Sequence, residues 1–289
     1  MPGSRVFAEG VLAGRVALVT GGGTNLGKAA AAELARGGAA VTIAGRRVDV
    51  LEQAAEEIEC SYVAGDIREA EGAQSIIRSV LDQHGRLDFL LNNAGGQYFV
   101  PAESITAKGW RAVQRLNVQG TVNMCQAAYE LTMREGEGTI VNVTVSPHHG
   151  MPAMAHTGAA RAAVEALTKE LAADWEASGV SVAAIALGRF ATESLQKYPA
   201  ELWRRAAQSV PLQRLGEVEE YGWLVALLAS PLGRAFSGSV ITLDGALDNW
   251  TGPWPPSDLV RDGQVPTEER RVREKARWVP DQEGRVPEP

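Results

Sequence analysis

The stretch Arg15-Val-Ala-Leu-Val-Thr-Gly-Gly-Gly-Thr-Asn-Leu-Gly-Lys28 decides the fold of this chain. Its apolar run, Val16–Val19, has the composition of a buried strand, and it breaks into a glycine-rich turn that leads at once into an alanine-rich helical segment. A turn in that position points free backbone N–H groups and a helix N-terminus at one place, which favours a phosphate. The stretch therefore predicts a dinucleotide-binding fold.

Strand-like and helical patterns alternate along the rest of the chain. Further strand-like runs lie at Ala40–Ala44, Ser61–Ala64, Leu87–Asn92, Thr139–Val145, Ser181–Leu187 and Ser239–Leu243. Helical patterns lie between them, at Lys28–Arg36, Val48–Glu59, Glu71–Gln83, Lys108–Arg134, Ala159–Glu176 and Glu217–Ala229. Because this alternation requires parallel strands joined by right-handed crossovers, we expect a single-domain α/β fold. It is a doubly wound (Rossmann) parallel sheet of about seven strands with helices on both faces.

The two ends of the chain differ in composition from this alternating part. We expect residues 1–14 to form a lead-in, residues 15–249 the dinucleotide-binding domain, and residues 250–289 a Trp- and Pro-rich flap followed by a charged tail. Within the tail, Thr267–Arg277 has acidic residues at its start and basic residues at its end, the order that a helix dipole favours. That pattern predicts a short helix.

Composition excludes several classes of partner. The net charge is −7 and no long basic run occurs, so we expect no nucleic-acid binding. Cys60 and Cys125 lie far apart without metal-ligand spacing, which indicates a reducing compartment and no metal site. No apolar run has the length of a signal-peptide core or a membrane span, so the sequence predicts a cytoplasmic protein without membrane attachment.

The turn Thr20-Gly-Gly-Gly-Thr-Asn-Leu-Gly27 resembles the cofactor turn of the short-chain dehydrogenase/reductase family, whose pattern is T-G-x-x-x-G-x-G. Asn25 replaces the middle glycine of that pattern. Because Asn tolerates positive φ, we expect the turn to persist, with the side chain crowding the pyrophosphate and lowering affinity. The resemblance implies cofactor contacts from Gly21, Thr24, Asn25, Leu26 and Gly27. A purely structural turn without a cofactor is the alternative.

The second strand ends in Ala44-Gly-Arg-Arg47. In a dinucleotide fold this strand end meets the adenosine ribose, where a carboxylate binds the 2′-hydroxyl of NAD(H) and an arginine binds the 2′-phosphate of NADP(H). No carboxylate stands there, so Arg46 and Arg47 favour NADP(H). The resemblance places further cofactor contacts after the third, fourth and sixth strands, at Asp66, Ile67, Asn93, Ala94, Gly95 and Thr192.

The resembled family reduces ketones with a Ser, a Tyr and a Lys four residues after the Tyr, helped by an Asn on the preceding helix. Here the Asn is Asn117, the Tyr position holds Thr157 and the Lys position holds Arg161. The Ser position falls on Thr144 by spacing to the helix, or on Val145 by the strand motif. A Thr hydroxyl is too weak an acid to replace a phenol. Arg161 stays charged, so it cannot shuttle a proton. It can bind the ribose hydroxyls of the cofactor and stabilise an oxyanion.

A narrower resemblance is to the 2,4-dienoyl-CoA reductase branch, which works without the usual Tyr. Gly21–Thr24 with Leu26–Lys28 resembles the mitochondrial form, and His156 before Gly158 resembles the peroxisomal form. The chain departs from this branch at Asn25, Arg161 and Leu187. Conjugate reduction of an unsaturated acyl-CoA thioester collects negative charge on the thioester oxygen, so it needs oxyanion donors more than a strong acid.

The resemblance implies a catalytic set of Asn117, Thr144, His156, Thr157 and Arg161, in which His156 either packs at a helix start or relays a proton. The expected function is an NADP(H)-dependent reductase of an acyl-CoA or a related conjugated compound. Two alternatives stay open: an alcohol or aldehyde dehydrogenase with a replacement acid, and a non-redox lyase, isomerase or inactive scaffold. The family also implies a homotetramer, a dimer of dimers that pairs through Val122–Ala128 and Gly158–Ala163.

Overall fold

The computed structural model describes residues 3–146, 148–193 and 200–249. By its internal contacts the chain divides into two units, Met1–Asp248 and Asn249–Pro289. The flap, the charged tail and the helix expected at Thr267–Arg277 lie outside the described residues, and the division at residue 249 stays a prediction.

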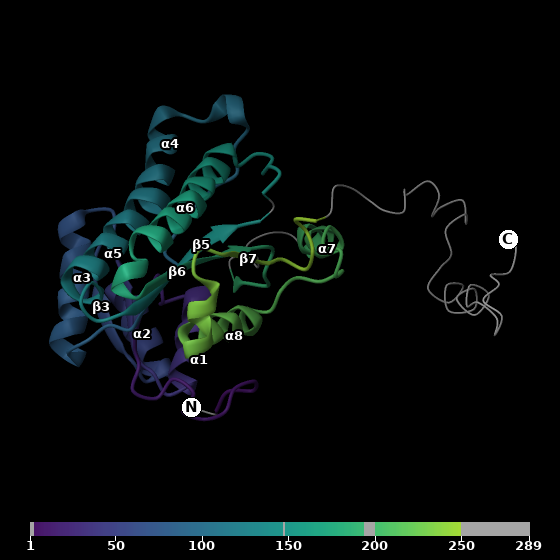
Figure 1. Ribbon diagram of the computed structural model, residues 1–289. Coiled ribbons are helices and arrows are strands. Elements are labelled where there is room, and N and C mark those ends of the chain that lie inside the picture. Colours follow the sequence, from purple (N-terminus) through teal and green to yellow (C-terminus); the bar gives the residue numbers. More distant parts are fainter. Residues whose placement is uncertain (1–2, 147, 194–199, 250–289) are drawn as a thin grey trace, which may run out of the picture. The chain divides into compact units, whose positions relative to one another are not determined.

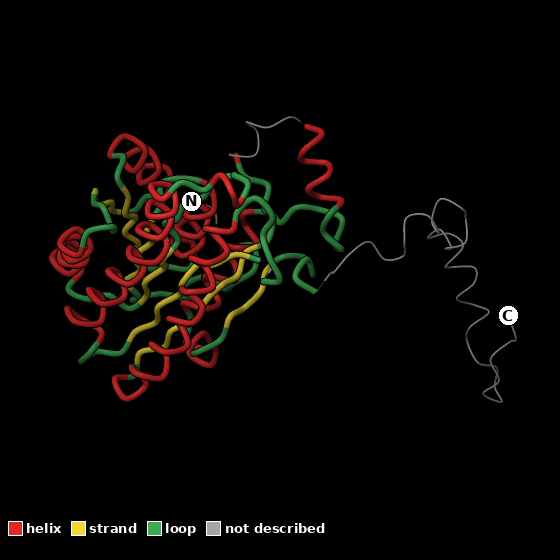
Figure 2. The backbone as a smooth tube through the Cα atoms, turned by 90° about the horizontal axis from the view of Figure 1, so that it is seen from above, coloured by secondary structure: helices red, strands yellow, loops and turns green. Residues whose placement is uncertain are grey.

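Seven strands of the described residues form one parallel sheet in the order β3-β2-β1-β4-β5-β6-β7 (Figures 1 and 2). Their bounds are β1 Val16–Thr20, β2 Ala40–Gly45, β3 Ser61–Ala64, β4 Phe89–Asn92, β5 Gly138–Val145, β6 Val180–Leu187 and β7 Val240–Leu243. The predicted doubly wound sheet is confirmed. Its strand order reverses between β1 and β4, and in such sheets ligands bind at the carboxyl ends of the strands beside this reversal.

Two groups of helices cover the two faces of the sheet. On one face pack α1 Asn25–Arg36, α2 Val48–Ile58 and α8 Val218–Ala229. On the other face pack α3 Ala70–His84, α5 Gly120–Ala128 and α6 Ala155–Asp174, and α4 Ala107–Gln114 lies against α6 (Figure 1). Strand side chains alternate between the two cores: Ala17 and Val19 enter the first, and Val16 and Leu18 the second. Both faces are therefore buried, as a parallel sheet requires.

The helix predicted over Lys108–Arg134 is interrupted by two π-helical turns. After α4 the first one, η2, spans Arg115–Gln119, and after α5 the second, η3, spans Tyr129–Met133. Apolar periodicity cannot distinguish these turns from α-helix, because a π turn adds only one residue. The first of them contains Asn117.

Further differences from the expectation concern α6 and one additional helix. Helix α6 begins at Ala155, four residues before the predicted start, because the N–H groups of Thr157 and Gly158 already bond the carbonyl of Met154. Helix α7, Ala200–Gln208, was not predicted. Short 3-10 turns complete the described elements: η1 Ala102–Ser104, η4 Glu176–Ser178 and η6 Pro231–Phe236. Among the described helices, none is both long and apolar enough to cross a membrane.

Candidate active site

The glycine turn after β1 is held by close backbone packing. A Cβ at Gly27 would lie 2.2 Å from the carbonyl oxygen of Gly21, so only glycine fits there. Gly21 itself has a φ of +66°. The hydroxyl of Thr20 accepts the N–H groups of Asn93 and Ala94 at 3.1 and 3.0 Å, which ties the turn to the segment after β4. The turn thus opens directly into the N-terminus of α1, between Thr24 and Leu26, as phosphate binding requires.

Asn25 adopts the left-handed conformation that the sequence led us to expect, with a φ of +46°. Its side-chain Oδ1 accepts the backbone N–H of Glu193 at 3.1 Å. Glu193 directly follows Thr192 in the segment beyond β6, so the amide joins the glycine turn to that segment. Asn25, which departs from the family pattern, therefore connects the glycine turn to the segment after β6 at the predicted cofactor site.

The residues expected to choose the nucleotide lie at the ends of β2 and β3. Arg46 and Arg47 are exposed directly after β2. Asp66 follows β3, and the hydrogen bonds from the Arg68 guanidinium, with a smaller contribution from the charge of Arg46, lower the pKa of Asp66 to about 2. Ile67 is buried in the core. Exposed cations beside a glycine turn and a helix N-terminus suit an NADP(H) cofactor, so the residues present fit that group.

Asn117 braces the segment after β4. Its side-chain amide is fully buried, donates to the carbonyls of Gly96 and Val113 at 2.8 and 2.9 Å, and accepts the N–H of Gly96 at 3.2 Å. A Cβ at Gly95 would lie 2.9 Å from Asn117 Oδ1 and 2.3 Å from Nη2 of Arg161. Asn117, Gly95 and Arg161 are thus brought together at the carboxyl ends of β4 and β5.

Arg161 carries a buried positive charge at this point. Its Nη1 donates to the carbonyl of Val143 at 2.6 Å, and its Nε has no hydrogen-bond partner among the described residues. Burial lowers the pKa of Arg161 to about 10, so the guanidinium remains charged at neutral pH. None of the described carboxylates forms an ion pair with it. A buried cation in this state favours an anionic ligand group.

The start of α6 holds two further polar side chains without partners. His156 is fully buried, lies edge-on against the Tyr98 ring at 4.5 Å between centroids, and neither of its ring nitrogens is hydrogen-bonded within the described structure. The hydroxyl of Thr157 is buried and likewise unpartnered. A cavity lies beside Arg161, and neither of these side chains lines it. The structure therefore does not place His156 where a proton relay to the substrate would need it.

That cavity, of about 290 Å³, adjoins the predicted site and contains residues that the sequence analysis did not select. It is lined by Val145, His148, Gly150, Met151, Ala155, Gly158, Arg161, Ala162 and Glu165. Oε1 of Glu165 accepts the hydroxyl of Thr144 at 2.7 Å and lies 2.9 Å from Nε2 of His148. The only sequence signal for Glu165 is its place one helical turn after Arg161, which puts both on one face of α6.

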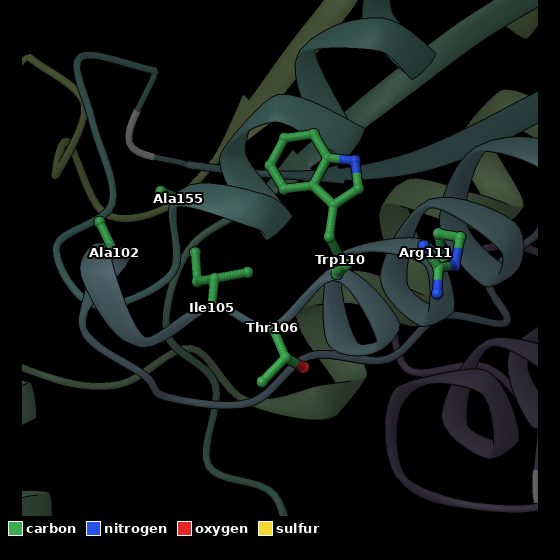
Figure 3. A pocket seen from close by; sticks show the side chains of 7 residues that line it. Ala102, Ile105, Thr106, Trp110, Arg111 and Ala155 are labelled. Carbon is green, nitrogen blue, oxygen red and sulfur yellow. The ribbon is translucent and has the colours of Figure 1, made fainter.

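A larger pocket, of about 550 Å³, lies next to this cavity. It is lined by Ala102, Ile105, Thr106, Ala107, Trp110, Arg111 and Ala155 (Figure 3). Ala155 lines both hollows, so they meet at the start of α6. The aromatic ring of Trp110 and the aliphatic side chain of Ile105 make this second pocket largely apolar. Within the described residues, no group of three or more His, Cys, Asp or Glu side chains could hold a metal ion.

Fold and site together define a dinucleotide-binding α/β protein with a modified active-site helix. The model of the Enoyl-(Acyl carrier protein) reductase family matches residues 22–247. A peroxisomal 2,4-dienoyl-CoA reductase of Danio rerio, named as (3E)-enoyl-CoA-producing, is 32% identical in an alignment of 252 residues that covers 84% of this chain and 84% of the relative. A Bacillus subtilis protein named probable 2,4-dienoyl-CoA reductase, (2E)-enoyl-CoA-producing, is 34% identical and covers 83% of this chain and 98% of its own.

A solved structure shows the same architecture. The NADP active-site complex of RhlG from Pseudomonas aeruginosa is 28% identical and superimposes with a TM-score of 0.79. The match covers 84% of this chain and 100% of the RhlG chain. The chain belongs to the short-chain dehydrogenase/reductase family, and the predicted resemblance to its 2,4-dienoyl-CoA reductase branch is confirmed. It is an oxidoreductase of a fold that uses a nicotinamide cofactor.

Proposed function

We propose that this protein is an NADP(H)-dependent reductase of a conjugated alkene, with a 2,4-dienoyl- or enoyl-CoA thioester as substrate. One observation carries the proposal: Arg161 buries a positive charge that forms no ion pair within the described residues, beside the carboxyl ends of β4 and β5 and at a site whose Tyr position holds Thr157. Such a site can stabilise an oxyanion but lacks the phenol that ketone reduction uses. The names of the two curated relatives support the same substrate class.

The geometry of the strand ends supports a proposed set of cofactor residues. The turn between Gly21 and Gly27 would hold the pyrophosphate, and Arg46 with Arg47 the 2′-phosphate. Asp66 would meet the adenine, and Arg161 the nicotinamide ribose. Bound NADPH supplies the hydride that reduces the alkene. The NADP complex of the structural neighbour supports this choice of nucleotide.

Arg161 would also stabilise the reacting thioester. Reduction of the distal alkene carbon moves an electron pair toward the thioester oxygen, and a buried guanidinium lowers the energy of the charge that collects there. A single preorganised donor of this kind contributes about 2.7–4 kcal/mol to the transition state. Thr157 lies one turn before Arg161, but its side chain does not line the cavity, so we assign the oxyanion to Arg161.

The larger pocket suits the hydrocarbon part of such a substrate. Trp110 and Ile105 offer apolar contact area, and Ala155 connects this pocket to the cavity that holds Arg161. An acyl chain in the pocket would leave its thioester end near α6. Burial of each methylene contributes about 0.8 kcal/mol, so longer chains should bind more tightly.

The test is a turnover assay with the purified full chain. A 2,4-dienoyl-CoA and NADPH are mixed, and loss of nicotinamide absorbance is followed, with the matching saturated acyl-CoA as a control that offers no alkene. We expect NADPH to be consumed with the dienoyl-CoA and not with the saturated acyl-CoA. Turnover of a simple alcohol or aldehyde in its place would support the dehydrogenase alternative. No turnover of either kind, together with no NADPH binding by fluorescence, would support a non-redox role.

We also propose that the chain assembles as a dimer of dimers through the outer faces of α5 and α6. Gly158–Ala163 is rich in small residues, which allows two helices to approach closely, and closed symmetric assemblies are the rule among soluble oligomers. Light scattering at micromolar concentration should give four times the mass of one chain. A monomer at that concentration would contradict the proposal.

A further inference from the structure

The loop after β5 holds a histidine in a fixed position. Nδ1 of His148 lies 2.5 Å from Oδ2 of Asp248, and the backbone N–H of the same histidine donates to Oδ1 at 2.5 Å. On its other edge, Nε2 lies 2.9 Å from Oε1 of Glu165. An imidazole placed between two carboxylates in this way is oriented on both sides, which a solvated loop residue would not be.

The two carboxylates are themselves held in place. Glu165 on α6 accepts the hydroxyl of the buried Thr144. The backbone N–H of Asp248 donates to Asp244 at 2.7 Å, and Asp244 also accepts the hydroxyl of Ser146. The result is a connected polar network that joins the ends of β5 and β7 to α6.

The same histidine faces both the cavity and water. Its side chain lines the cavity together with Arg161 and Glu165, and it is 33% exposed. It can therefore contact a molecule in the cavity and regain a proton from solvent. The other charged or titratable groups near it are His149, whose Nδ1 lies 3.5 Å from Oδ1 of Asp248, and Asp244 behind Asp248.

We propose that His148 is the proton donor of this site, oriented by Glu165 and Asp248. The inference rests on the proposed function, because it concerns the charged intermediate that reduction of a conjugated thioester creates. In the step, the Nε2–H turns from Glu165 to the cavity and its N–H bond breaks. An electron pair of the dienolate forms the new C–H bond, the thioester carbonyl is restored, and the neutral imidazole keeps the N–H electron pair.

The charge state of His148 agrees with this role. Partial burial lowers its pKa, but the hydrogen bonds and negative charges of Asp248 and Glu165 outweigh that effect, so the pKa lies above its usual value. A raised histidine pKa means that the imidazolium is present at low pH and is lost as the pH rises through the folded-state value. Turnover should therefore fall as the pH rises, over the range in which His148 loses its proton.

The position of the donor also decides which product forms. After reduction of the distal alkene carbon, a proton at the carbon next to the thioester gives a 3-enoyl product, and a proton two carbons further gives a 2-enoyl product. The two curated relatives are named for these two different products. A fixed donor on one wall of the cavity should give one product, whereas protonation by solvent should give a mixture.

The experiment compares His148→Gln with a matched control, His149→Gln, in the full chain. His149 is the next residue and also lies near Asp248, but it does not line the cavity. For each protein we measure the pH profile of kcat with a 2,4-dienoyl-CoA and NADPH, the ratio of 2-enoyl to 3-enoyl product, and NADPH affinity by fluorescence. Glu165→Gln and Asp248→Asn test the positioning role, and the histidine pKa is read by NMR titration.

We expect His148→Gln to lower kcat by roughly 100-fold, the lower range for loss of a general acid, to remove the alkaline fall and to mix the products, with NADPH affinity unchanged. Glu165→Gln and Asp248→Asn should lower the pKa of His148 and move the alkaline fall to lower pH. The inference is overturned if His148→Gln keeps the parent's pH profile and product ratio, or if His149→Gln alone reproduces the losses. A parent that reduces no conjugated thioester would overturn the proposed function itself, a result that is distinct because it appears before any substitution.

Discussion

The glycine turn and the start of α6 meet the same edge of the sheet, but they satisfy their polar groups in opposite ways. Around the turn, Thr20 and Asn93 exchange hydrogen bonds between side chain and backbone, and Tyr221 donates to Asn93 at 3.2 Å. At the start of α6, His156, Thr157 and Arg161 bury four side-chain nitrogen or oxygen atoms that find no partner among the described residues.

Because an unpartnered buried polar atom destabilises a protein by about 1–3 kcal/mol, the two regions should respond differently to substitution. Changes at the turn should damage stability and cofactor binding together. Changes at the start of α6 should leave stability the same or better, and loss of Arg161 should also damage chemistry. Substitutions in the two regions should therefore separate stability from chemistry.

The largest effect is expected from Gly27→Ala. The new Cβ would lie 2.2 Å from a backbone oxygen of Gly21, and neither atom belongs to a flexible side chain. We expect the free energy of unfolding to fall by about 3 kcal/mol, the upper range for overpacking, and NADPH binding to be lost. Denaturant unfolding and fluorescence titration measure the two.

The matched control is Gly158→Ala, also a helical glycine, around which a Cβ meets no atom within 4 Å. Removing a helical glycine should stabilise a single chain by about 0.8–1.0 kcal/mol, measured where light scattering finds the monomer, because Gly158 also lies in the proposed helix pairing. Equal responses of the two glycine variants would show that the turn is not held by close packing.

Arg161→Met should come next. Loss of the guanidinium should lower kcat on a dienoyl-CoA by about 100–1000-fold, as for removal of an oxyanion donor. Stability should change little, because the buried charge has no carboxylate partner among the described residues, which offsets the loss of its hydrogen bond to the Val143 carbonyl. Arg161→Lys, which keeps the charge, should retain measurable turnover. Full activity in Arg161→Met would remove this helix from catalysis.

Arg46→Ala tests nucleotide choice at the other end of the cofactor site. NADPH binding should weaken by about 1.5–3 kcal/mol, the range for a charge-assisted hydrogen bond, with little change for NADH. Calorimetric titration with both nucleotides measures the difference. The same loss for both nucleotides would contradict recognition of a 2′-phosphate.

Thr157→Val should give the smallest effect and the clearest contrast with the turn. The substitution removes a buried hydroxyl that has no partner among the described residues, so the free energy of unfolding should rise by up to about 1 kcal/mol. Turnover should change little, because this hydroxyl does not line the cavity beside Arg161. A loss of stability would show that the hydroxyl is hydrogen-bonded in solution.

The sequence was informative where one local pattern determines structure. Val16–Val19 and the following glycines predicted β1, its turn and α1, because a buried strand and a glycine-rich helix start each have a characteristic composition over a few consecutive residues. Asn117 and Arg161 could be placed by the same local alignment. The network around His148 could not, because Glu165 and Asp248 lie 17 and 100 residues from it and meet it only through the folded sheet.

Asn117 lies in a π-helical turn, Arg115–Gln119, whose shape depends on the number of residues in it. A π turn holds one residue more than the α-helical turn it replaces. Deleting one residue there would restore an α-helical turn and keep α4 and α5 in nearly the same rotational register, because the π turn absorbs its extra residue. Only the turn itself would be reshaped, and with it the position from which the Asn117 amide bonds the carbonyls of Gly96 and Val113. A one-codon deletion between α4 and α5 is therefore expected to leave both helices in place and to remove the brace of the segment after β4.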